Sequence, residues 1–339
     1  FEDSTGQPLQ GMLQKWITAE GFPQIKAELN GDTLTLSQKR FTFLPNNEDT
    51  IWPTPIWLTL YFADGTEEKR QLLVGTPSMS FTVEKTLRSV CLNIGRKGFY
   101  RCLYSADNFM ALAELAAAKK LEHAYRWGLL GDLSAAVKAG QIDFEILERA
   151  CVLMQDEDQP LALNGLTSAI IESFIALDNH RKAIASFALP IFEKALAKIG
   201  LEPKTEEANA VAAVRERLLW GAVFMGGSRV QEFLEAQFKA LQANTEIDAD
   251  IVKSVMQCAA LNGGREAFDW LVARFRTSNV EHDRMNILLA LGCVKEPEII
   301  AELLEFVITE VPPRNQYIPV AAMGQNPYAK DFLWPWFRD

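Results

Sequence analysis

The chain has 339 residues, of which 48% are hydrophobic, enough for about two domains with sizeable cores. Its 44 Asp and Glu residues against 34 Lys and Arg give a formal net charge of -10, so its surface repels phosphate backbones and anionic membranes. No apolar run approaches the roughly 20 residues that cross a bilayer. We therefore expect neither a nucleic-acid partner nor a membrane segment.

The first residues predict a short helix in a chain that belongs to something longer. The stretch from Phe1 to Gly6 is polar and acidic, does not begin with Met, and is no secretory signal. We therefore expect an excised or processed piece. Residues 9–20 are predicted to be helical, ending at Gly21-Phe22-Pro23. Four apolar side chains share one face of this helix: Leu9, Met12, Leu13 and Trp16.

From residue 23 to residue 105, apolar residues alternate, as on strands with one buried face. Asn30-Gly31 predicts a tight hairpin in which both of these residues are central and take positive φ. Asp64-Gly65 predicts a second hairpin, whose charged return strand through Arg70 should lie at a sheet edge. Further strands are expected at 80–83, 89–94 and 99–104. About six to eight short strands with turns between them predict a small antiparallel β-sandwich.

From Ala106 onward, apolar residues recur at helical spacing, and pairs of helices repeat about every 30–40 residues. Each helical hairpin must stack on its neighbours to bury its apolar face, which predicts a curved array. The expected fold is therefore multidomain α and β. It comprises a terminal helix (1–22), a small antiparallel β-sandwich (23–105), and an all-α, HEAT/armadillo-like superhelical domain (106–339).

The cysteines and histidines show no metal-binding or catalytic spacing. The five cysteines are widely spaced without a Cys-x-x-Cys pair, which predicts reduced, buried thiols and favours a cytoplasmic compartment. A metalloprotease helix needs His-Glu-x-x-His, but His123, His180 and His282 are followed by Ala, Arg and Asp. No Gly-x-Ser-x-Gly elbow is present. We therefore expect no catalytic, cofactor-binding or metal-binding residue in this chain.

The remaining polar and aromatic clusters have structural explanations. Gly226-Gly227 and Gly263-Gly264 lack the spacing of phosphate-binding loops and are interpreted as turns between helices. The acidic runs 156–158 and 206–207 are interpreted as solvated surface. The aromatic stretch 332–337 could be a binding surface, but helix core is the favoured interpretation.

Three segments resemble the carboxyl-terminal part of M1-family zinc aminopeptidases. The segment 12–25 is similar to the junction where the catalytic domain of that family leads into its β-sandwich. The segment 93–104 resembles the last sandwich strands, with their Asn, Gly, Tyr-Arg and final Tyr. The segments 125–132 and 139–143 resemble the first helical hairpin, where the family usually has Asp at the position of Tyr125.

The resemblance implies a non-catalytic role in a peptide-cleaving enzyme. In this family the helical domain closes over the catalytic domain, encloses the substrate chamber and accommodates the peptide. The implied partners are the upstream catalytic domain and peptide substrates, and the implied zinc lies in that missing domain. The resemblance also implies that the terminal helix in 1–22 is left over from the catalytic domain and that the helical domain 106–339 is truncated at its end. The alternative function is a free-standing helical-repeat adaptor that binds other proteins on its concave face.

Overall fold

The computed structural model describes residues 10–44 and 50–338. Leu9 and the segment from Phe1 to Gly6 lie outside the described residues. Contacts divide the chain into two compact units, Phe1–Ala169 and Ile170–Asp339, and the division falls inside one helix. Each unit is described by itself.

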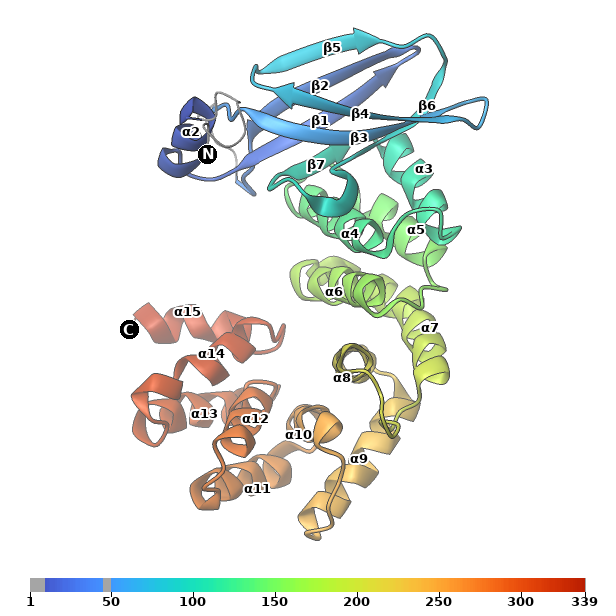
Figure 1. Cartoon of the computed structure of the whole chain (residues 1–339). Helices are drawn as coiled ribbons and strands as arrows, with labels where there is room; N and C mark the ends of the chain where they lie inside the picture. The colour runs from blue at the N-terminus through green and yellow to red at the C-terminus, as the bar shows by residue number, and fades with distance from the viewer. Residues whose placement is uncertain (1–9, 45–49, 339) are drawn as a thin grey trace. The chain divides into compact units, whose positions relative to one another are not determined.

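The first unit contains the strands and the first helices (Figure 1). Its elements are α2 (Gln10–Thr18), β1 (Pro23–Asn30), β2 (Thr33–Arg40), β3 (Thr54–Phe62), β4 (Glu67–Val74), β5 (Ser78–Thr82), β6 (Leu87–Leu92), η1 (Ile94–Arg96), β7 (Arg101–Tyr104), α3 (Ala106–Ala117), α4 (His123–Lys138), α5 (Phe144–Leu153) and the first part of α6 (Pro160–Ala176). The predicted change from strands to helices thus falls between Tyr104 and Ala106.

The strands form two facing sheets, as the alternating pattern predicts. One sheet has the order β5-β2-β1-β7 and the other β4-β3-β6. All pairings are antiparallel except that of β1 with β7. Ile25, Leu34, Leu36 and Leu60 are fully buried between the sheets, because alternate residues of each strand face the core. The predicted β-sandwich is therefore present.

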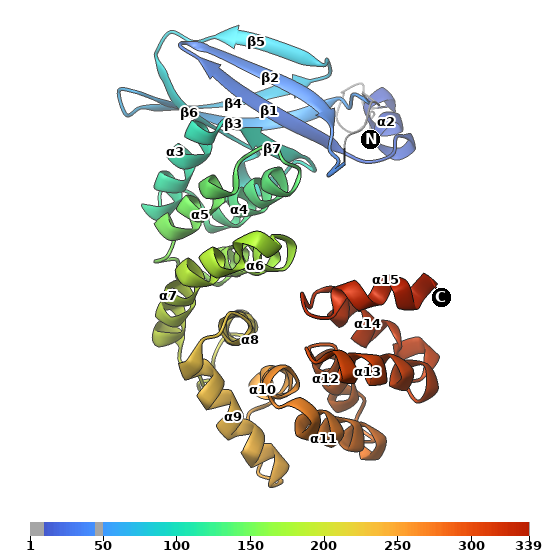
Figure 2. The same ribbon diagram turned by 180° about the vertical axis from the view of Figure 1, so that it is seen from behind.

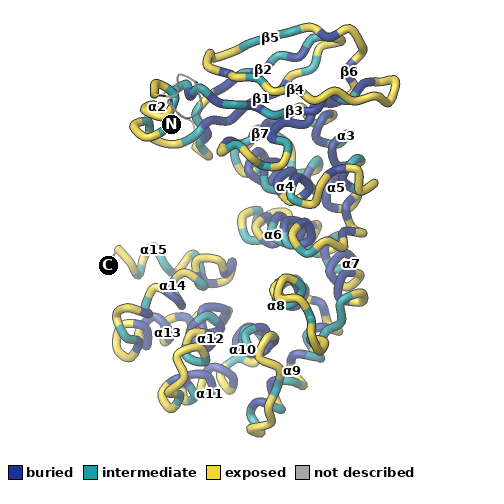
Figure 3. Tube along the Cα trace, viewed as in Figure 1, coloured by how far each residue is buried: buried dark blue, intermediate teal, exposed yellow. Residues whose placement is uncertain are grey.

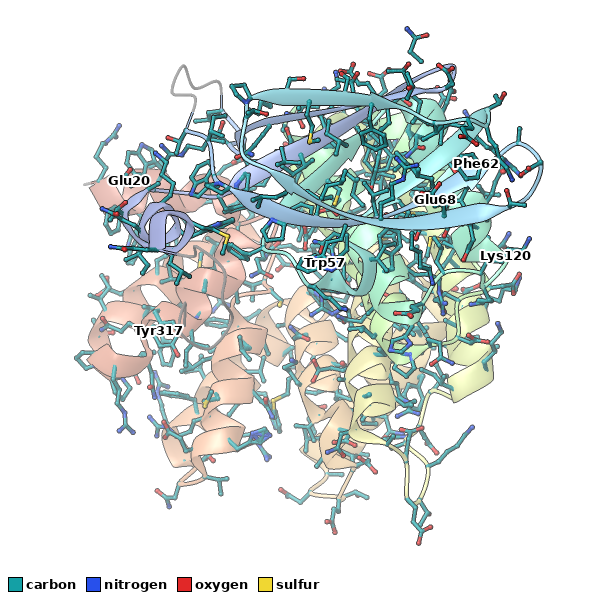
Figure 4. All side chains as sticks on the ribbon, turned by 45° about the horizontal axis from the view of Figure 1, so that its top comes forward. Glu20, Trp57, Phe62, Glu68, Lys120 and Tyr317 are labelled. Carbon is teal, nitrogen blue, oxygen red and sulfur yellow. The ribbon has the colours of Figure 1, made fainter. Side chains whose placement is uncertain are left out.

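The charged return strand β4 lies at the edge of its sheet, as predicted. Its side chains are mostly exposed, and Glu68 among them is labelled in Figure 4. Glu68 pairs with Arg70 on the same strand, with 2.6 Å between Oε1 and Nε. Charge along an unpaired edge discourages another strand from adding there.

The first hairpin is one residue out of the predicted register. Asn30 pairs with Thr33, so Gly31 and Asp32 are the central residues of the turn. Only Gly31 has a positive φ, of 64°, whereas the predicted turn had Asn30 and Gly31 at its centre, both with positive φ. That prediction was wrong about the turn type, because Asn30 continues the ladder and Gly31 alone takes the left-handed conformation.

Helices α3 and α4 pack against the strands β6 and β7. Figure 3 shows buried residues along α3. Among them, Phe109 and Leu112 are fully buried and belong to the core of this unit. The division of the chain into domains 23–105 and 106–339 stays a prediction, because the first helices belong to the same compact unit as the strands.

The second unit is a two-layered array of helices. Its elements after α6 are η2 (Asp178–His180), α7 (Arg181–Ile199), α8 (Asn209–Phe224), α9 (Ser228–Gln242), α10 (Ala249–Asn262), α11 (Gly264–Thr277), α12 (Glu281–Leu291), α13 (Pro297–Thr309), η3 (Pro313–Asn315), α14 (Tyr317–Gly324) and α15 (Lys330–Arg338). Helices α8, α10, α12 and α14 contact one another in succession and form the concave layer, while α7, α9, α11 and α13 form the outer layer (Figures 1 and 2). The predicted helical-hairpin array is confirmed.

Among the described residues, no single helix has the length and apolar composition needed to cross a bilayer. Only α6 and the segment 178–199, taken together across the break between them, meet those criteria.

Gly31 gives a stability prediction for the sandwich. A Cβ at this position would meet no atom within 4 Å, so the cost of a side chain comes from the positive φ alone. Gly31→Val should lower the free energy of unfolding by about 1–2 kcal/mol, which urea denaturation would measure. The control is Gly75→Val, at a glycine with equally open surroundings and no positive φ, and its effect should stay within about 0.5 kcal/mol. An unchanged midpoint for Gly31→Val would contradict the turn geometry.

Candidate functional site on the concave helical layer

Two of the segments singled out in the sequence, 93–104 and 125–132, meet where β7 and the turn before it contact helix α4 in the first unit. Between β6 and β7 the chain turns through three residues with positive φ: Asn93 at 59°, Gly95 at 69° and Arg96 at 53°. The Asn93 side chain holds this turn closed. Its Oδ1 accepts from the Gly98 N–H at 2.8 Å, and its Nδ2 donates to the Gly98 carbonyl at 2.9 Å. A backbone forced into this conformation persists only where its surroundings over-determine it.

Asp132 of α4 forms the ion pairs that connect this helix to the turn and to β7. Its buried carboxylate lies 2.7 Å from Nη1 of Arg96 and 3.4 Å from Nη1 of Arg101. A Cβ at Gly128, one helical turn earlier, would lie 2.3 Å from Nε and Cζ of Arg96, so a side chain there would displace the guanidinium. Burial lowers the pKa of Arg96, but the Asp132 carboxylate outweighs it and the net pKa is raised. The guanidinium therefore stays charged.

A pair of buried tyrosines makes a second polar contact between the strands and α4. The hydroxyls of Tyr104 and Tyr125 lie 3.0 Å apart, and the Tyr104 hydroxyl accepts from the Leu92 N–H at 2.8 Å. Burial raises the pKa of both tyrosines and of the nearby Cys91 thiol, so all three stay protonated. Tyr125, which stands where the family usually has Asp, thus links α4 to β6 and β7.

Glu157 is buried, so the expectation of a solvated acidic surface was wrong for this residue. Its carboxylate accepts from Arg126 at 2.7 and 3.0 Å, from Lys119 at 2.9 Å, and from the backbone N–H groups of Asp158 and Gln159 at 3.0 Å. Burial raises its pKa, but these hydrogen bonds together outweigh burial and lower the pKa from 4.5 to about 2. The buried Arg126 requires this charge, because an unpaired buried cation is strongly unfavourable.

Glu207 departs from the same expectation. It pairs with Arg215, whose side chain is fully buried and also donates to the carbonyl of Gly200 at 3.0 Å and that of Ile199 at 3.1 Å. The hydrogen bond from Arg215 lowers the pKa of Glu207. Both buried pairs are structural, since every charged group in them has intramolecular partners.

The other sequence candidates divide into confirmed and corrected ones. Gly226, with φ of 89°, and Gly227 connect α8 to α9, and Gly264 begins α11, so both glycine pairs are interhelical turns as predicted. All five cysteines are buried and unbridged, as predicted. The core interpretation of 332–337 was wrong, since Trp334 is 67% and Phe337 is 76% exposed on α15. An amphipathic pattern shows that a helix has an apolar face but not that the face is covered.

The concave layer of the second unit carries a cavity of 250 Å³. Side chains from α8, α10, α12 and α14 line it together with two residues of α6. Trp220, Gln257 and Cys293 are among the lining residues. At one wall Glu216 pairs with Lys253 of the next helix in the layer. The Trp220 ring stacks on Phe224 with 4.8 Å between centroids, which fixes an aromatic surface at the cavity.

Gln257 leaves an unused hydrogen-bond acceptor at this cavity. Its Nε2 lies 3.8 Å from Sγ of Cys293, while its Oε1 is buried and has no hydrogen-bond partner among the described residues. Such a group is unfavourable unless something donates to it. Burial raises the pKa of Cys293 to about 12, so its thiol is not a nucleophile. The lining of the cavity therefore includes an amide oxygen without a donor and a thiol that stays protonated.

The residues described in the structure do not form a zinc site. No group of three or more His, Cys, Asp or Glu residues in the ranges 10–44 and 50–338 is placed to hold a metal ion. His123 begins α4, His180 lies in η2 and His282 lies in α12. This donor set does not fit a bound zinc.

A β-sandwich followed along the chain by an array of helical hairpins defines the class of this protein as one with a helical-repeat domain. Residues 89–339 match the family model of the ERAP1-like C-terminal domain, and the chain belongs to that family.

The curated relatives are aminopeptidases. The chain is 22% identical to probable aminopeptidase 2 of Sulfurisphaera tokodaii, 25% to aminopeptidase M1-D of Oryza sativa and 23% to aminopeptidase M1 of Arabidopsis thaliana. In each case the match covers 100% of this chain, but only 40%, 41% and 41% of the respective relative. The chain thus corresponds to less than half of these enzymes.

The depressed pKa of Glu157 gives a pH prediction. A carboxylate whose pKa falls from 4.5 to about 2 on folding stabilises the protein above pH 4.5, and this contribution is lost as the pH drops toward 2. Glu157→Gln should therefore lower the free energy of unfolding by about 3 kcal/mol at neutral pH, and by progressively less in acid. Urea denaturation at several pH values would measure this. Asp158→Asn, at an exposed neighbour, should change stability by less than about 1 kcal/mol at every pH.

The metal prediction concerns the purified chain. Because it lacks paired His or Cys ligands, we expect it to retain no stoichiometric zinc after dialysis. Elemental analysis is the measurement, and one tightly held zinc ion per chain would contradict the prediction.

Proposed function

We propose that this chain is the non-catalytic carboxyl-terminal region of an M1 zinc aminopeptidase. In this proposal an upstream domain holds the zinc and removes amino-terminal residues, while this chain closes over the chamber and accommodates the body of the peptide. Family membership and the aminopeptidase relatives support the first part. The concave cavity supports the second, and its unsatisfied Gln257 Oε1 is the observation that carries it.

The cavity has the chemistry of a peptide-binding surface. An extended peptide presents backbone N–H groups, one of which can donate to Gln257 Oε1. Trp220 offers an aromatic surface for a side chain, and the Glu216–Lys253 pair accommodates either charge. Such contacts order a substrate and exclude water without contributing a reacting group. We therefore assign no catalytic step to this chain.

The alternative of a free-standing adaptor is not favoured. The aminopeptidase relatives match the chain from end to end, strands and helices alike. An adaptor would not need an upstream hydrolase.

The purified chain should release no amino acid from any peptide, and aminopeptidase activity from the chain alone would overturn the proposal.

The proposed accommodation of the peptide body predicts that activity depends on substrate length. In the intact protein, Trp220→Ala should lower kcat/KM for a peptide of about ten residues roughly fivefold to tenfold, mainly through KM, because a buried aromatic contact is lost. Hydrolysis of a single amino-acid amide, which does not reach the concave layer, should stay unchanged. Steady-state kinetics on both substrates is the measurement.

Trp270→Ala is the matched control. Trp270 lies on the outer-layer helix α11 and packs edge-on against Phe238 with 5.0 Å between centroids. This variant should lose stability without discriminating between the two substrates. If Trp220→Ala affects both substrates equally, or neither, the proposed accommodation of peptides on this face is wrong.

A further inference from the structure

A cavity at the connections between successive hairpins of the second unit has no role in the proposed function. It measures 390 Å³ and lies where α9 leads into α10 and where α11 leads into α12, all of which contact α10 (Figure 1). This volume is within the roughly 300–1,000 Å³ typical of small-molecule sites. Apolar side chains line it from both connections, namely Leu241, Ile247, Val252 and Val280. The cavity can therefore hold an aliphatic group.

Asn286 gives this cavity a polar group that the chain does not use. It lies on α12, lines the cavity and is only 8% exposed. Among residues 10–44 and 50–338, its side-chain amide has no hydrogen-bond partner. A carboxamide carries an acceptor oxygen and two N–H donors, and leaving them unmatched in a buried position is unfavourable. A ligand that both donates and accepts would satisfy it.

The α11–α12 side of the cavity is held by charged groups that already have partners. Arg274 donates to both carboxylate oxygens of Asp283 at 3.1 Å. Arg284 closes the connection by donating to the carbonyls of Phe275 and Ser278, each at 3.4 Å. Arg274 is therefore not available to pair with a ligand, and this wall is fixed.

The α9–α10 side is held by its backbone. Asn244 takes a positive φ of 59°, and its N–H donates to the carbonyl of Leu241 at 3.1 Å. At the start of α10, the Asp248 side chain accepts from the N–H of Asp250 at 2.9 Å. Both connections are thus ordered by contacts within the chain. A preformed cavity lowers the entropic cost of binding.

The charges around the cavity favour a neutral ligand. Its lining carries two carboxylates, Glu246 and Asp283, against one guanidinium, that of Arg274. An anion would meet this surplus of negative charge. A buried cation has no free partner either, because Arg274 already occupies Asp283 and Glu246 is exposed. Asn286 and the apolar walls therefore decide what fits.

We infer that this cavity binds a small neutral molecule in which a carboxamide is attached to an aliphatic group. The ligand N–H donates to Oδ1 of Asn286, and the ligand oxygen accepts from its Nδ2. The aliphatic group packs on Leu241, Ile247 and Val252. The inference does not rest on the proposed peptide-binding function, because this cavity shares no lining residue with the concave one.

Three probes of nearly the same shape test the inference with the full chain: cyclohexanecarboxamide, cyclohexyl methyl ketone and cyclohexanecarboxylate. Ligand-observed NMR titration measures their affinities at neutral pH. The carboxamide should bind roughly fivefold to tenfold more tightly than the ketone, which cannot donate to Asn286, and than the carboxylate, which the surplus negative charge repels. Equal affinities for the carboxamide and the ketone would overturn the inference, and so would tightest binding by the carboxylate.

Variants locate the site. Asn286→Leu should weaken carboxamide binding roughly fivefold to tenfold and remove the preference over the ketone, without lowering the thermal midpoint, because no intramolecular hydrogen bond is lost. Val252→Phe should fill the cavity and abolish binding. Gln257→Leu, which removes an amide from the concave cavity, is the control and should leave binding unchanged. The inference is wrong if Asn286→Leu keeps the preference, or if Gln257→Leu weakens binding as much.

Thermal unfolding gives an independent measurement. A ligand held between two successive hairpins binds only the folded chain, so cyclohexanecarboxamide at tenfold its Kd should raise the midpoint of the unchanged chain. It should not raise the midpoint of Asn286→Leu at the same concentration by as much, nor that of Val252→Phe at all. An unchanged midpoint in all three would contradict the inference. Neither measurement involves peptide cleavage, so failure here is distinguishable from failure of the proposed function.

Discussion

Asp132 is buried and forms ion pairs with two arginines that precede the helices in the chain. One carboxylate facing Arg96 and Arg101 leaves a surplus of positive charge, which is tolerable because Arg101 is one-third exposed while Arg96 and Asp132 are covered. The contact depends on Gly128, since any side chain there would displace Arg96. It depends equally on the positive φ values around Asn93, which turn Arg96 toward α4. Strand pairing, turn strain and helix packing are therefore coupled through one ion pair.

This coupling explains why the compact units do not follow the change of secondary structure. The strands end at Tyr104, yet α3 and α4 pack on them and share the buried polar contacts of Asp132 and Tyr125. A helical hairpin that contributes to the core of a sandwich belongs to it energetically, whatever its secondary structure. The periodicity of the sequence predicts where the strands end and the helices begin. It does not predict which helices pack against the strands.

Local patterns predicted most of the elements, and failures arose where a distant partner decides the outcome. Alternation and helical spacing located the two sheets and the helical hairpins. The position of the Asn30-Gly31 turn was one residue off, because both residues suit a turn and only the strand register decides between them. Glu157 lies in an acidic run that predicts solvent exposure, but the buried Arg126, 31 residues earlier in the chain, overrides that pattern. For 332–337, the spacing predicts an apolar helical face and cannot say whether another element covers it.

The spacing of contacting residues in the second unit is a sequence feature that a search for motifs does not detect. Polar partners in the second unit recur at one repeat length: Gln257 and Cys293 are 36 residues apart, Arg265 and Glu302 are 37, and Asn326 and Gly292 are 34. Residues at equivalent positions of successive hairpins thus meet within each layer, as stacking requires. A sequence aligned to itself at this period would have brought Glu216 and Lys253 together.

Two cavities of the second unit, the concave one and one where α7 begins and α8 ends, are lined by polar groups that the chain leaves partly unsatisfied. The concave one has an amide oxygen without a donor, and the other has an amide nitrogen and two lysines without an anion. The concave cavity contains no ionised thiol, since burial raises the pKa of Cys293 to about 12. Each cavity is built from the local stacking of a few helices, so the repeat array creates such sites wherever successive hairpins meet.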